Sequence, residues 1–380
     1  MYYNLLKFPN INSARIAYLE EIVQHVQPDI FVVNELTSAS GASTILSSAM
    51  NTGPIVYNAA TYVSGPDDNN MLYYNSAKLG IIDENVIATS LRDINEYVLY
   101  YKDPGLTAQS DTTYLFVYGL HLKAGNSQDD ADRRGDESAV LRSYLNTRPW
   151  AENTIVGGDF NIYYSSEETY NNLTGSTQAD LHDEIGAGAW HNNNIYANVF
   201  TQSTRTTSFD GGATGGMDDR FDMILFSDDM INGANGAQYK SNSYTAIGQD
   251  GLRWNSSLVT PTNNSEPANI INALYYMSDH LPVYMEIEVG GEVGLNEEHT
   301  AHMEVYPNPT NGLLTIEMNA EGYDLSVIDM QGREVHHQNG LVMGKNEVDL
   351  SELNAGTYFC LLYTSPSPRD RTRSRMPSSA

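Results

Sequence analysis

Apolar positions along the first 290 residues follow either a helical or a strand periodicity, and most of the strand-like runs end at a polar residue. Between Ser13 and Gln27 apolar side chains recur every three or four positions, which predicts an amphipathic helix. Residues 137–145 predict a second helix with the same spacing. Strands are predicted by apolar or alternating runs at residues 30–33, 114–120, 154–158, 223–226 and 281–289. Strands mixed with helices and long polar loops predict a layered α/β sandwich.

The sequence pattern changes after residue 289, which predicts a second domain. Residues 290–302 form a linker rich in Gly and Glu. Residues 303–359 contain short strand-like runs, at 313–317 and 324–329, separated by Asn-Pro, Asn-Gly and Gln-Gly turns. This spacing predicts a small all-β sandwich. The predicted organisation is therefore a catalytic domain at 1–289, a linker, and a β domain at 303–359.

The two ends of the sequence carry features that we set apart from the fold. Residues 360–380 contain four arginines in an otherwise arginine-poor chain and resemble the translation of a common sequencing adaptor. We interpret this segment as read-through from an adaptor. The first residues lack the basic and apolar regions of a signal peptide, and they predict a strand that is entered partway. We therefore expect that an N-terminal signal is missing from the sequence.

Composition restricts the possible functions. The chain has 48 acidic and 20 basic residues and a formal net charge of -28. This excludes nucleic-acid binding through bulk positive charge, but it leaves room for an enzyme that meets phosphate through metal ions. The single cysteine excludes a disulfide framework and a cysteine-based zinc site. No apolar run reaches the roughly 18 residues of a membrane helix, so we expect no membrane span. As a working assumption we take the protein to be a monomer.

Polar residues at the predicted strand ends are the candidates for chemistry. They are Glu35, His121, Asp159, Asn161, Asp222, Asp279 and His280. Carboxylate and amide oxygens are ligands that Mg²⁺ or Ca²⁺ prefers, and Mg²⁺ typically combines one or two carboxylates with substrate phosphate. A histidine paired with a carboxylate can transfer protons near neutral pH. The set therefore predicts metal-assisted hydrolysis of a phosphoester.

The same segments carry a resemblance to a known family. The segments Tyr3–Leu6, Gly119–Lys123, Gly158–Asn161, Arg220–Asp222 and Ser278–Val283, together with Glu35, occur in the order seen in the endonuclease/exonuclease/phosphatase superfamily. The resemblance covers residues 1 to about 289 and implies a four-layered, DNase I-like α/β sandwich. The superfamily includes nucleases and sphingomyelinases.

The resemblance also implies roles for single residues. Glu35 is expected to ligate Mg²⁺ (or Mn²⁺ or Ca²⁺), with Asn4 and Asp279 close to the metal and the phosphate. Asp159 is expected to position or deprotonate the attacking water, and Asn161 to hold a phosphate oxygen. His280, oriented by Asp222, acts on the phosphate or as general base. His121 contacts the scissile phosphate or protonates the leaving oxygen.

The C-terminal domain has a resemblance of its own. Val305–Gly312, Val327–Val335 and Leu353–Tyr358 look like the sorting domain of the Bacteroidetes type IX secretion system. This implies that the protein contacts that machinery and is secreted or displayed on the cell surface.

Two functions remain open within the predicted chemistry. The first is an extracellular endonuclease that acts on DNA or RNA, and the alternative is a phosphodiesterase or phosphatase that acts on lipid or small phosphoesters. A non-catalytic surface protein is a third, less favoured hypothesis. Five basic residues are candidates for a phosphate track: Lys123, Arg133, Arg134, Arg142 and Arg205. If they do not gather beside His121 and His280, the nuclease hypothesis is weakened.

Overall fold

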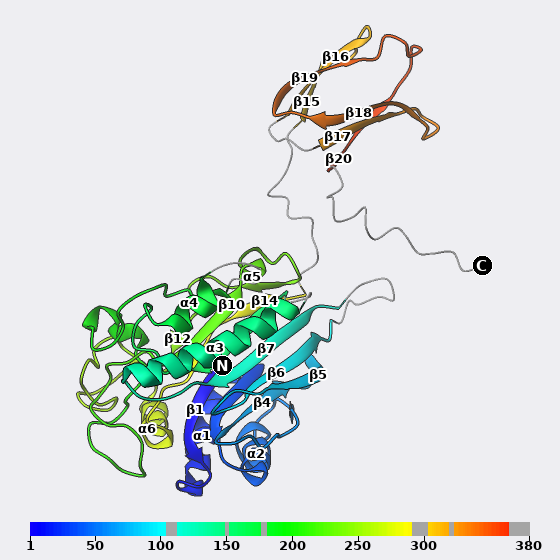
Figure 1. Ribbon diagram of the computed structural model, residues 1–380. Coiled ribbons are helices and arrows are strands. Elements are labelled where there is room, and N and C mark those ends of the chain that lie inside the picture. The colour runs from blue at the N-terminus through cyan, green and yellow to red at the C-terminus, as the bar shows by residue number, and fades with distance from the viewer. Residues whose placement is uncertain (104–111, 149–151, 176–180, 291–302, 319–322, 365–380) are drawn as a thin grey trace. The chain divides into compact units, whose positions relative to one another are not determined.

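The computed structural model describes residues 1–103, 112–148, 152–175, 181–290, 303–318 and 323–364. These residues form two compact units, Met1–Glu292 and Val293–Ala380, which are described separately. The first unit contains two six-stranded sheets with helices outside them (Figure 1).

The first sheet has the strand order β12-β13-β1-β2-β4-β3. Its strands are β1 (Tyr2–Phe8), β2 (Ile30–Leu36), β3 (Tyr57–Ala59), β4 (Asn69–Asn75), β12 (Thr245–Ala246) and β13 (Val283–Tyr284). Strands β1 and β2 are parallel, and the other pairs are antiparallel. Helices α1 (Ile16–Val26), α2 (Ala39–Ile45) and α6 (Ala268–Met277) belong to this half of the unit, where α1 packs against α6.

The second sheet has the order β5-β6-β7-β8-β10-β9. Its strands are β5 (Leu79–Ile87), β6 (Ile94–Tyr101), β7 (Tyr114–His121), β8 (Thr154–Asp159), β9 (Leu181–His182) and β10 (Asp222–Ser227). Strands β7 and β8 are parallel. Helices α3 (Gln128–Thr147) and α4 (Glu168–Thr174) pack against each other, and α3 supplies Leu141 and Leu145 to an apolar cluster with Phe116 and Tyr118 of β7.

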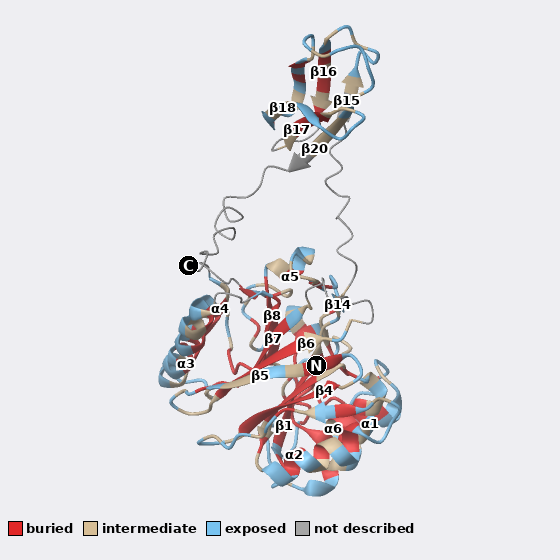
Figure 2. Cartoon of the chain, turned by 90° about the vertical axis from the view of Figure 1, so that its right-hand side faces the viewer, coloured by how far each residue is buried: buried red, intermediate tan, exposed pale blue. Residues whose placement is uncertain are grey.

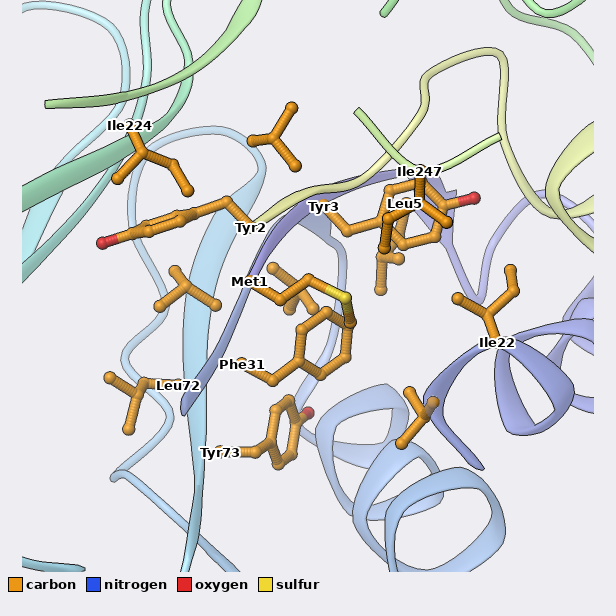
Figure 3. Packing of buried hydrophobic residues seen from close by; sticks show 14 of the residues in the cluster. Met1, Tyr2, Tyr3, Leu5, Ile22, Phe31, Leu72, Tyr73, Ile224 and Ile247 are labelled. Carbon is orange, nitrogen blue, oxygen red and sulfur yellow. The ribbon is translucent and has the colours of Figure 1, made fainter. Parts of the chain in front are cut away.

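The two sheets share a core. One cluster joins residues of the first sheet, such as Tyr2 and Val32, to Val117 and Ile224 of the second. Figure 3 shows the side chain of Tyr2 lying toward Ile224, whereas Ile22 of α1 lies on the other side of β1. Most strand positions of the two sheets are buried, although β5 has exposed ones, and the helices carry exposed positions on their outer faces (Figure 2). The layers are thus helix, sheet, sheet and helix, the predicted four-layered sandwich.

Several predicted boundaries differ from the structure. The predicted helix at 13–27 begins as a 3-10 turn, Ser13–Arg15, capped by the side chain of Asn12, and continues as α1. The second helix is longer than predicted because Ser127 and Asp130 form a capping box ahead of a polar first half. Residues 281–289 form two strands rather than one: β13 joins the first sheet, and β14 (Ile287–Val289) pairs with β11 (Ala237–Tyr239).

The remaining short elements of this unit are α5 (Asp229–Asn232), the 3-10 helix η3 (Asn194–Val199) and the π-helical turn η2 (Leu46–Met50). None of the helices in the described ranges combines the length and the apolar character that a membrane span requires.

The second unit is an all-β structure, as predicted. One sheet contains β15 (Met303–Tyr306), β16 (Leu313–Met318) and β19 (Gly344–Asp349). The other contains β18 (Glu334–Leu341), β17 (Tyr323–Ile328) and β20 (Phe359–Thr364). The adaptor-like segment was expected to begin at Cys360, yet residues 360–364 complete β20 along β17. The rest of that segment, 365–380, and the linker expected at 290–302 lie largely outside the described residues.

Candidate active site

The strand register brings the predicted site residues together. Parallel pairing aligns His121 at the end of β7 with Asp159 at the end of β8, and antiparallel pairing aligns Asp159 with Asp222 of β10. In the other sheet, β1 and β2 are parallel, so Asn4 lies beside Asn34, the neighbour of Glu35. Polar side chains from both sheets therefore lie close together, held by rigid strands, as is common in functional sites.

Asn4 links the carboxylates of the two sheets. Its amide Nδ2 donates to Glu35 Oε1 and to Asp159 Oδ2, each at 3.0 Å, and its Oδ1 accepts from the backbone N–H of Leu6. The remaining oxygen of Glu35 accepts from the backbone N–H of Lys7 at 3.0 Å. Two carboxylates on different sheets are thus held in a fixed geometry by one buried amide.

A divalent cation fits between these carboxylates. Ligand atoms of Glu35, His121 and Asp159 lie within 4.8 Å of one another. His121 Nε2 is 3.9 Å from Glu35 Oε1 and 3.5 Å from Asp159 Oδ2. Among the described residues, Nδ1 of His121 is buried without a hydrogen-bond partner. Two nearly buried carboxylates without a lysine or arginine ion pair in the described ranges are a donor set that suits Mg²⁺, Mn²⁺ or Ca²⁺.

His280 is oriented by Asp222 on the other side of Asp159. Its Nδ1 lies 2.7 Å from Asp222 Oδ2, and its Nε2 lies 3.7 Å from Asp159 Oδ2. Both His280 and Asp222 are buried. The carboxylate therefore fixes which ring nitrogen faces the site, the arrangement that general acid–base chemistry requires.

Asp279, the residue before His280, is buried and faces the loop at 202–216. Its Oδ2 accepts from the backbone N–H of Ala213 at 2.6 Å, and its Oδ1 is buried with no partner among the described residues. Gly212, with φ +82°, approaches so closely that a Cβ there would be 2.9 Å from the Asp279 carboxylate. Asp279 therefore anchors the 202–216 loop against the site.

Asn161 follows Asp159 in a tight turn. Its φ is +53°, a left-handed conformation that asparagine tolerates, and its backbone N–H donates to Asp159 Oδ1 at 3.1 Å. Its Nδ2 donates to the carbonyl of Leu122 at 3.1 Å, which leaves Oδ1 available. Asp159 thus has one oxygen held by Asn4 and the other by this turn.

Burial and neighbouring charges shift the pKa values in the site. Burial, together with Asp222 and Glu35, raises the pKa of Asp159 to about 7, against the lowering effect of His280. Burial also raises the pKa of Glu35. Burial, Arg92, His280 and Lys7 lower the pKa of His121 well below its usual value. A bound cation opposes the upward shifts because it favours the charged carboxylates.

His280 behaves differently from His121. Burial alone would lower its pKa, but the carboxylates of Asp222 and Asp159 outweigh burial and raise the pKa of His280 well above its usual value. The pKa values of the two imidazoles beside Asp159 are therefore shifted in opposite directions, which favours one neutral ring and one charged ring.

The structure also reveals site residues that sequence reasoning missed. The Gln202 amide lies 2.6 Å from His280 Nε2 and 3.5 Å from Asp279 Oδ2. Gln202 lies in a loop without periodic pattern, so no sequence signal marks it. His191 forms a second group with Asp218 and Asp219 and lies 2.6 Å from Asp219 Oδ1.

The five basic residues nominated for a phosphate track have other partners. Lys123 pairs with Asp130 at 2.6 Å, Arg134 is buried against Glu167, and Arg133 pairs with Asp129. Arg142 donates to the carbonyls of Asn172 and Leu173, and buried Arg205 donates to carbonyls of its own loop. Each of the five therefore has a partner within the protein, and whether they gather beside His121 and His280 stays a prediction.

A comparison with solved structures finds similar proteins at low sequence identity. TDP2 of D. rerio, complexed with a single-strand DNA product, is 15% identical with a TM-score of 0.49 and covers 76% of this chain and 97% of its own. An endonuclease/exonuclease/phosphatase family protein from Bacteroides thetaiotaomicron is 15% identical (TM-score 0.47, coverage 76% and 97%). The human Nocturnin catalytic domain with bound sulfate is 17% identical (TM-score 0.45, coverage 73% and 87%). A comparison with curated proteins gives no match.

Family models match both units of the chain. Residues 304–367 match the secretion system C-terminal sorting domain, which indicates secretion or display on the cell surface through the type IX system. Residues 1–280, most of the chain, match the Endonuclease/Exonuclease/phosphatase family. That match, together with the sandwich and the cluster of acids and histidines at its strand ends, identifies the chain as a member of the endonuclease/exonuclease/phosphatase family, whose members are generally phosphoester hydrolases.

Proposed function

We propose that the first unit is a divalent-metal-dependent phosphodiester hydrolase, exported by its C-terminal domain, with nucleic acid as its first candidate substrate. One observation carries the proposal. Nε2 of His121 and Nε2 of His280 converge on the same oxygen of Asp159, at 3.5 and 3.7 Å, beside the carboxylate of Glu35. Two imidazoles and two acids converging in a buried site are suited to a phosphate and a cation.

The site residues have two kinds of role, holding a cation and handling protons, and Asp159 takes part in both. Glu35 and Asp159 would hold the cation, which would neutralise phosphoryl oxygens as negative charge develops. Asn4 keeps the two carboxylates in register. Asp279 accepts from the Ala213 N–H, and its Oδ1, which has no hydrogen-bond partner among the described residues, is a further candidate ligand.

Proton handling falls to the histidines and Asp159. Asp222 holds His280 at Nδ1, so Nε2, which lies beside the Gln202 amide, is the nitrogen that can exchange a proton with a phosphate or water oxygen. Asp159 is held at both oxygens and can orient the attacking water. His121, kept neutral by burial and nearby cations, can donate to a phosphate oxygen or to the leaving group from whichever nitrogen carries its proton.

A smaller phosphodiester is the second candidate substrate. The observation that favours it is the internal pairing of the basic residues nominated for a nucleic-acid track. A chain with net charge -28 repels a polyanion over the Debye length of about 8 Å at physiological salt. A lipid headgroup or small diester avoids most of that repulsion.

A substrate panel with metals tests the proposal. We expect Mg²⁺ or Mn²⁺ to support hydrolysis of a phosphodiester, EDTA to abolish it, and Asp159→Asn or His280→Ala to reduce kcat by about 10²–10⁴-fold. Asp228→Asn, an exposed aspartate next to β10, is the matched control. Turnover that persists in EDTA contradicts the mechanism. Cleavage of lipid or small phosphoesters without action on DNA or RNA selects the second substrate.

A further inference from the structure

Two basic and two acidic side chains lie beside the proposed metal site. Lys7 lies 4.0 Å from Asp68, and Arg92 lies 3.1 Å from Asp67. The Lys7 backbone N–H donates to Glu35, and the Arg92 guanidinium donates to the carbonyl of Leu122, the residue after His121. The four residues come from the end of β1 and from loops next to β4 and β6.

The two cations differ in how firmly they are held. The side chain of Arg92 is 12% exposed, and its guanidinium bonds to Asp67 and to the carbonyl of Leu122. The side chain of Lys7 is 53% exposed, and its 4.0 Å separation from Asp68 is too long for a hydrogen bond. The Lys7 ammonium therefore keeps donors that can turn to a ligand.

The backbone of Lys7 ties this residue to the proposed metal site. Its N–H donates to Glu35 Oε2 at 3.0 Å, so the lysine follows directly from a residue of the proposed metal site. A lysine carries a flexible stem with a strongly hydrated point charge, a common form of phosphate contact.

Asp68 carries the charge opposite to that of Lys7 but accepts no hydrogen bond from it. Its side chain is 10% exposed, and Oδ2, the atom nearest to Lys7, is buried without a hydrogen-bond partner in the described part of the chain. A buried carboxylate oxygen without a donor is an unfavourable state. A phosphate oxygen that reaches Lys7 therefore displaces a weak internal contact.

We infer that Lys7 binds a second phosphate group of the substrate, next to the one that is cleaved, and that Asp68 competes with that group for the lysine. The inference rests on the proposed hydrolase function and narrows its substrate to phosphodiesters that carry a flanking phosphate. It also explains how an acidic protein with internally paired arginines can recognise a nucleotide. The recognition is local and is set by one lysine and its counter-ion.

Two dinucleotides that differ in one group test the inference. Thymidylyl-thymidine has a single diester, and its 5′-phosphorylated and 3′-phosphorylated forms add the flanking group on either side. For the unaltered protein with Mn²⁺, we expect kcat/KM to be higher for one phosphorylated form than for the parent. Lys7→Met should lower that ratio about tenfold, and Asp68→Asn should raise it about threefold. Ratios near one for both phosphorylated forms overturn the inference.

Opposite effects of the two substitutions separate recognition from structure. If Lys7 and Asp68 only stabilised the fold as an ion pair, both substitutions would act in the same direction. Lys78→Met is the matched control, because Lys78 is 55% exposed, like Lys7, and pairs with Asp29 rather than with a residue of the proposed site. It should leave the ratio unchanged, and high salt should reduce the ratio of the unaltered protein.

A binding measurement keeps the inference separate from the proposed hydrolysis. Calorimetry with the Asp159→Asn protein compares the affinities for the phosphorylated and parent dinucleotides without turnover. One outcome is that the unaltered protein hydrolyses no dinucleotide while the Asp159→Asn protein still binds the phosphorylated form more tightly through Lys7. In that case the proposed nuclease activity fails and the phosphate site stands. Equal affinity for all forms, or binding of none, contradicts the inference.

Discussion

At the scale of single residues, Asp222 is expected to act through His280. Asp222→Asn removes the charge 2.7 Å from His280 Nδ1 and should lower both kcat and the pKa of His280, because that carboxylate is a main cause of its raised pKa. Loss of the orienting acid typically costs about 10²–10⁴-fold in rate. Steady-state kinetics and an NMR titration of His280 check both effects. An unchanged histidine titration would show that the pairing is not made in solution.

Asn4 is expected to act on metal affinity rather than on protons. Asn4→Ala removes the amide that joins Glu35 to Asp159 and leaves two facing carboxylates without their shared donor. Residues that orient metal ligands typically contribute about 10–100-fold to affinity, so the Mn²⁺ dissociation constant should rise by about that factor. Calorimetry measures it, and Asn58→Ala, at an exposed position in β3, is the control. Equal Mn²⁺ affinity in both variants would remove Asn4 from the metal site.

The residue scale also shows what the sequence could reveal about the site. Glu35, His121, Asp159 and Asp222 were predictable because each ends or begins an apolar strand, and strand register then forces them together. Gln202 and His191 were not predictable, since they lie in loops whose course depends on long-range contacts. Lys7 could not be predicted either, because its link to the site is a backbone hydrogen bond to Glu35 that forms only in the folded chain.

At the scale of secondary structure, apolar continuity predicted several central strands but failed for β4, a strand with polar residues at both ends. Strand β4 contains Asn69, Asn70 and Asn75, yet every one of its residues is buried. Asn70 is accommodated because its amide donates to Asn95 Oδ1 and the carbonyl of Gly119 and its Oδ1 accepts from Asn34. Composition alone assigns such a segment to a loop, because only the folded neighbours satisfy its amides.

Gly158 of β8 is expected to be indispensable for the element that carries Asp159. Its φ is +136°, and a Cβ there would be 2.0 Å from the carbonyl oxygen of Leu120 in the neighbouring strand. Gly158→Ala should therefore destabilise the unit by roughly 3 kcal/mol or more and displace Asp159. Thermal or urea unfolding and activity measure the two effects.

Gly186→Ala separates strain from steric clash in that experiment. Gly186 also has a positive φ, +75°, but no heavy atom of the described residues lies within 4 Å of the place that a methyl group would occupy. The substitution should cost only about 1–2 kcal/mol, the penalty of a left-handed conformation. Equal losses in the two variants would mean that β7 moves aside to accept the methyl group at position 158.

At the scale of the whole molecule, the proposed chemistry and the export signal belong to different units. All the proposed site residues lie in Met1–Glu292, and the sorting domain lies in Val293–Ala380. Each unit has its own apolar core, the second one built around Ile316, Leu325 and Val327. A unit with its own core can fold alone, so the two functions should be separable.

Ending the chain at Glu292 is expected to separate them. With the same export leader on both proteins in a type IX host, the shortened chain should keep kcat/KM within about twofold in lysates, because no proposed site residue is removed. It should be absent from the cell surface and the medium, because it lacks the sorting domain. Activity assays on lysate, washed cells and medium measure both outcomes on one protein. Surface activity of the shortened chain would contradict the export role, whereas inactive but folded protein would show that the second unit contributes to catalysis.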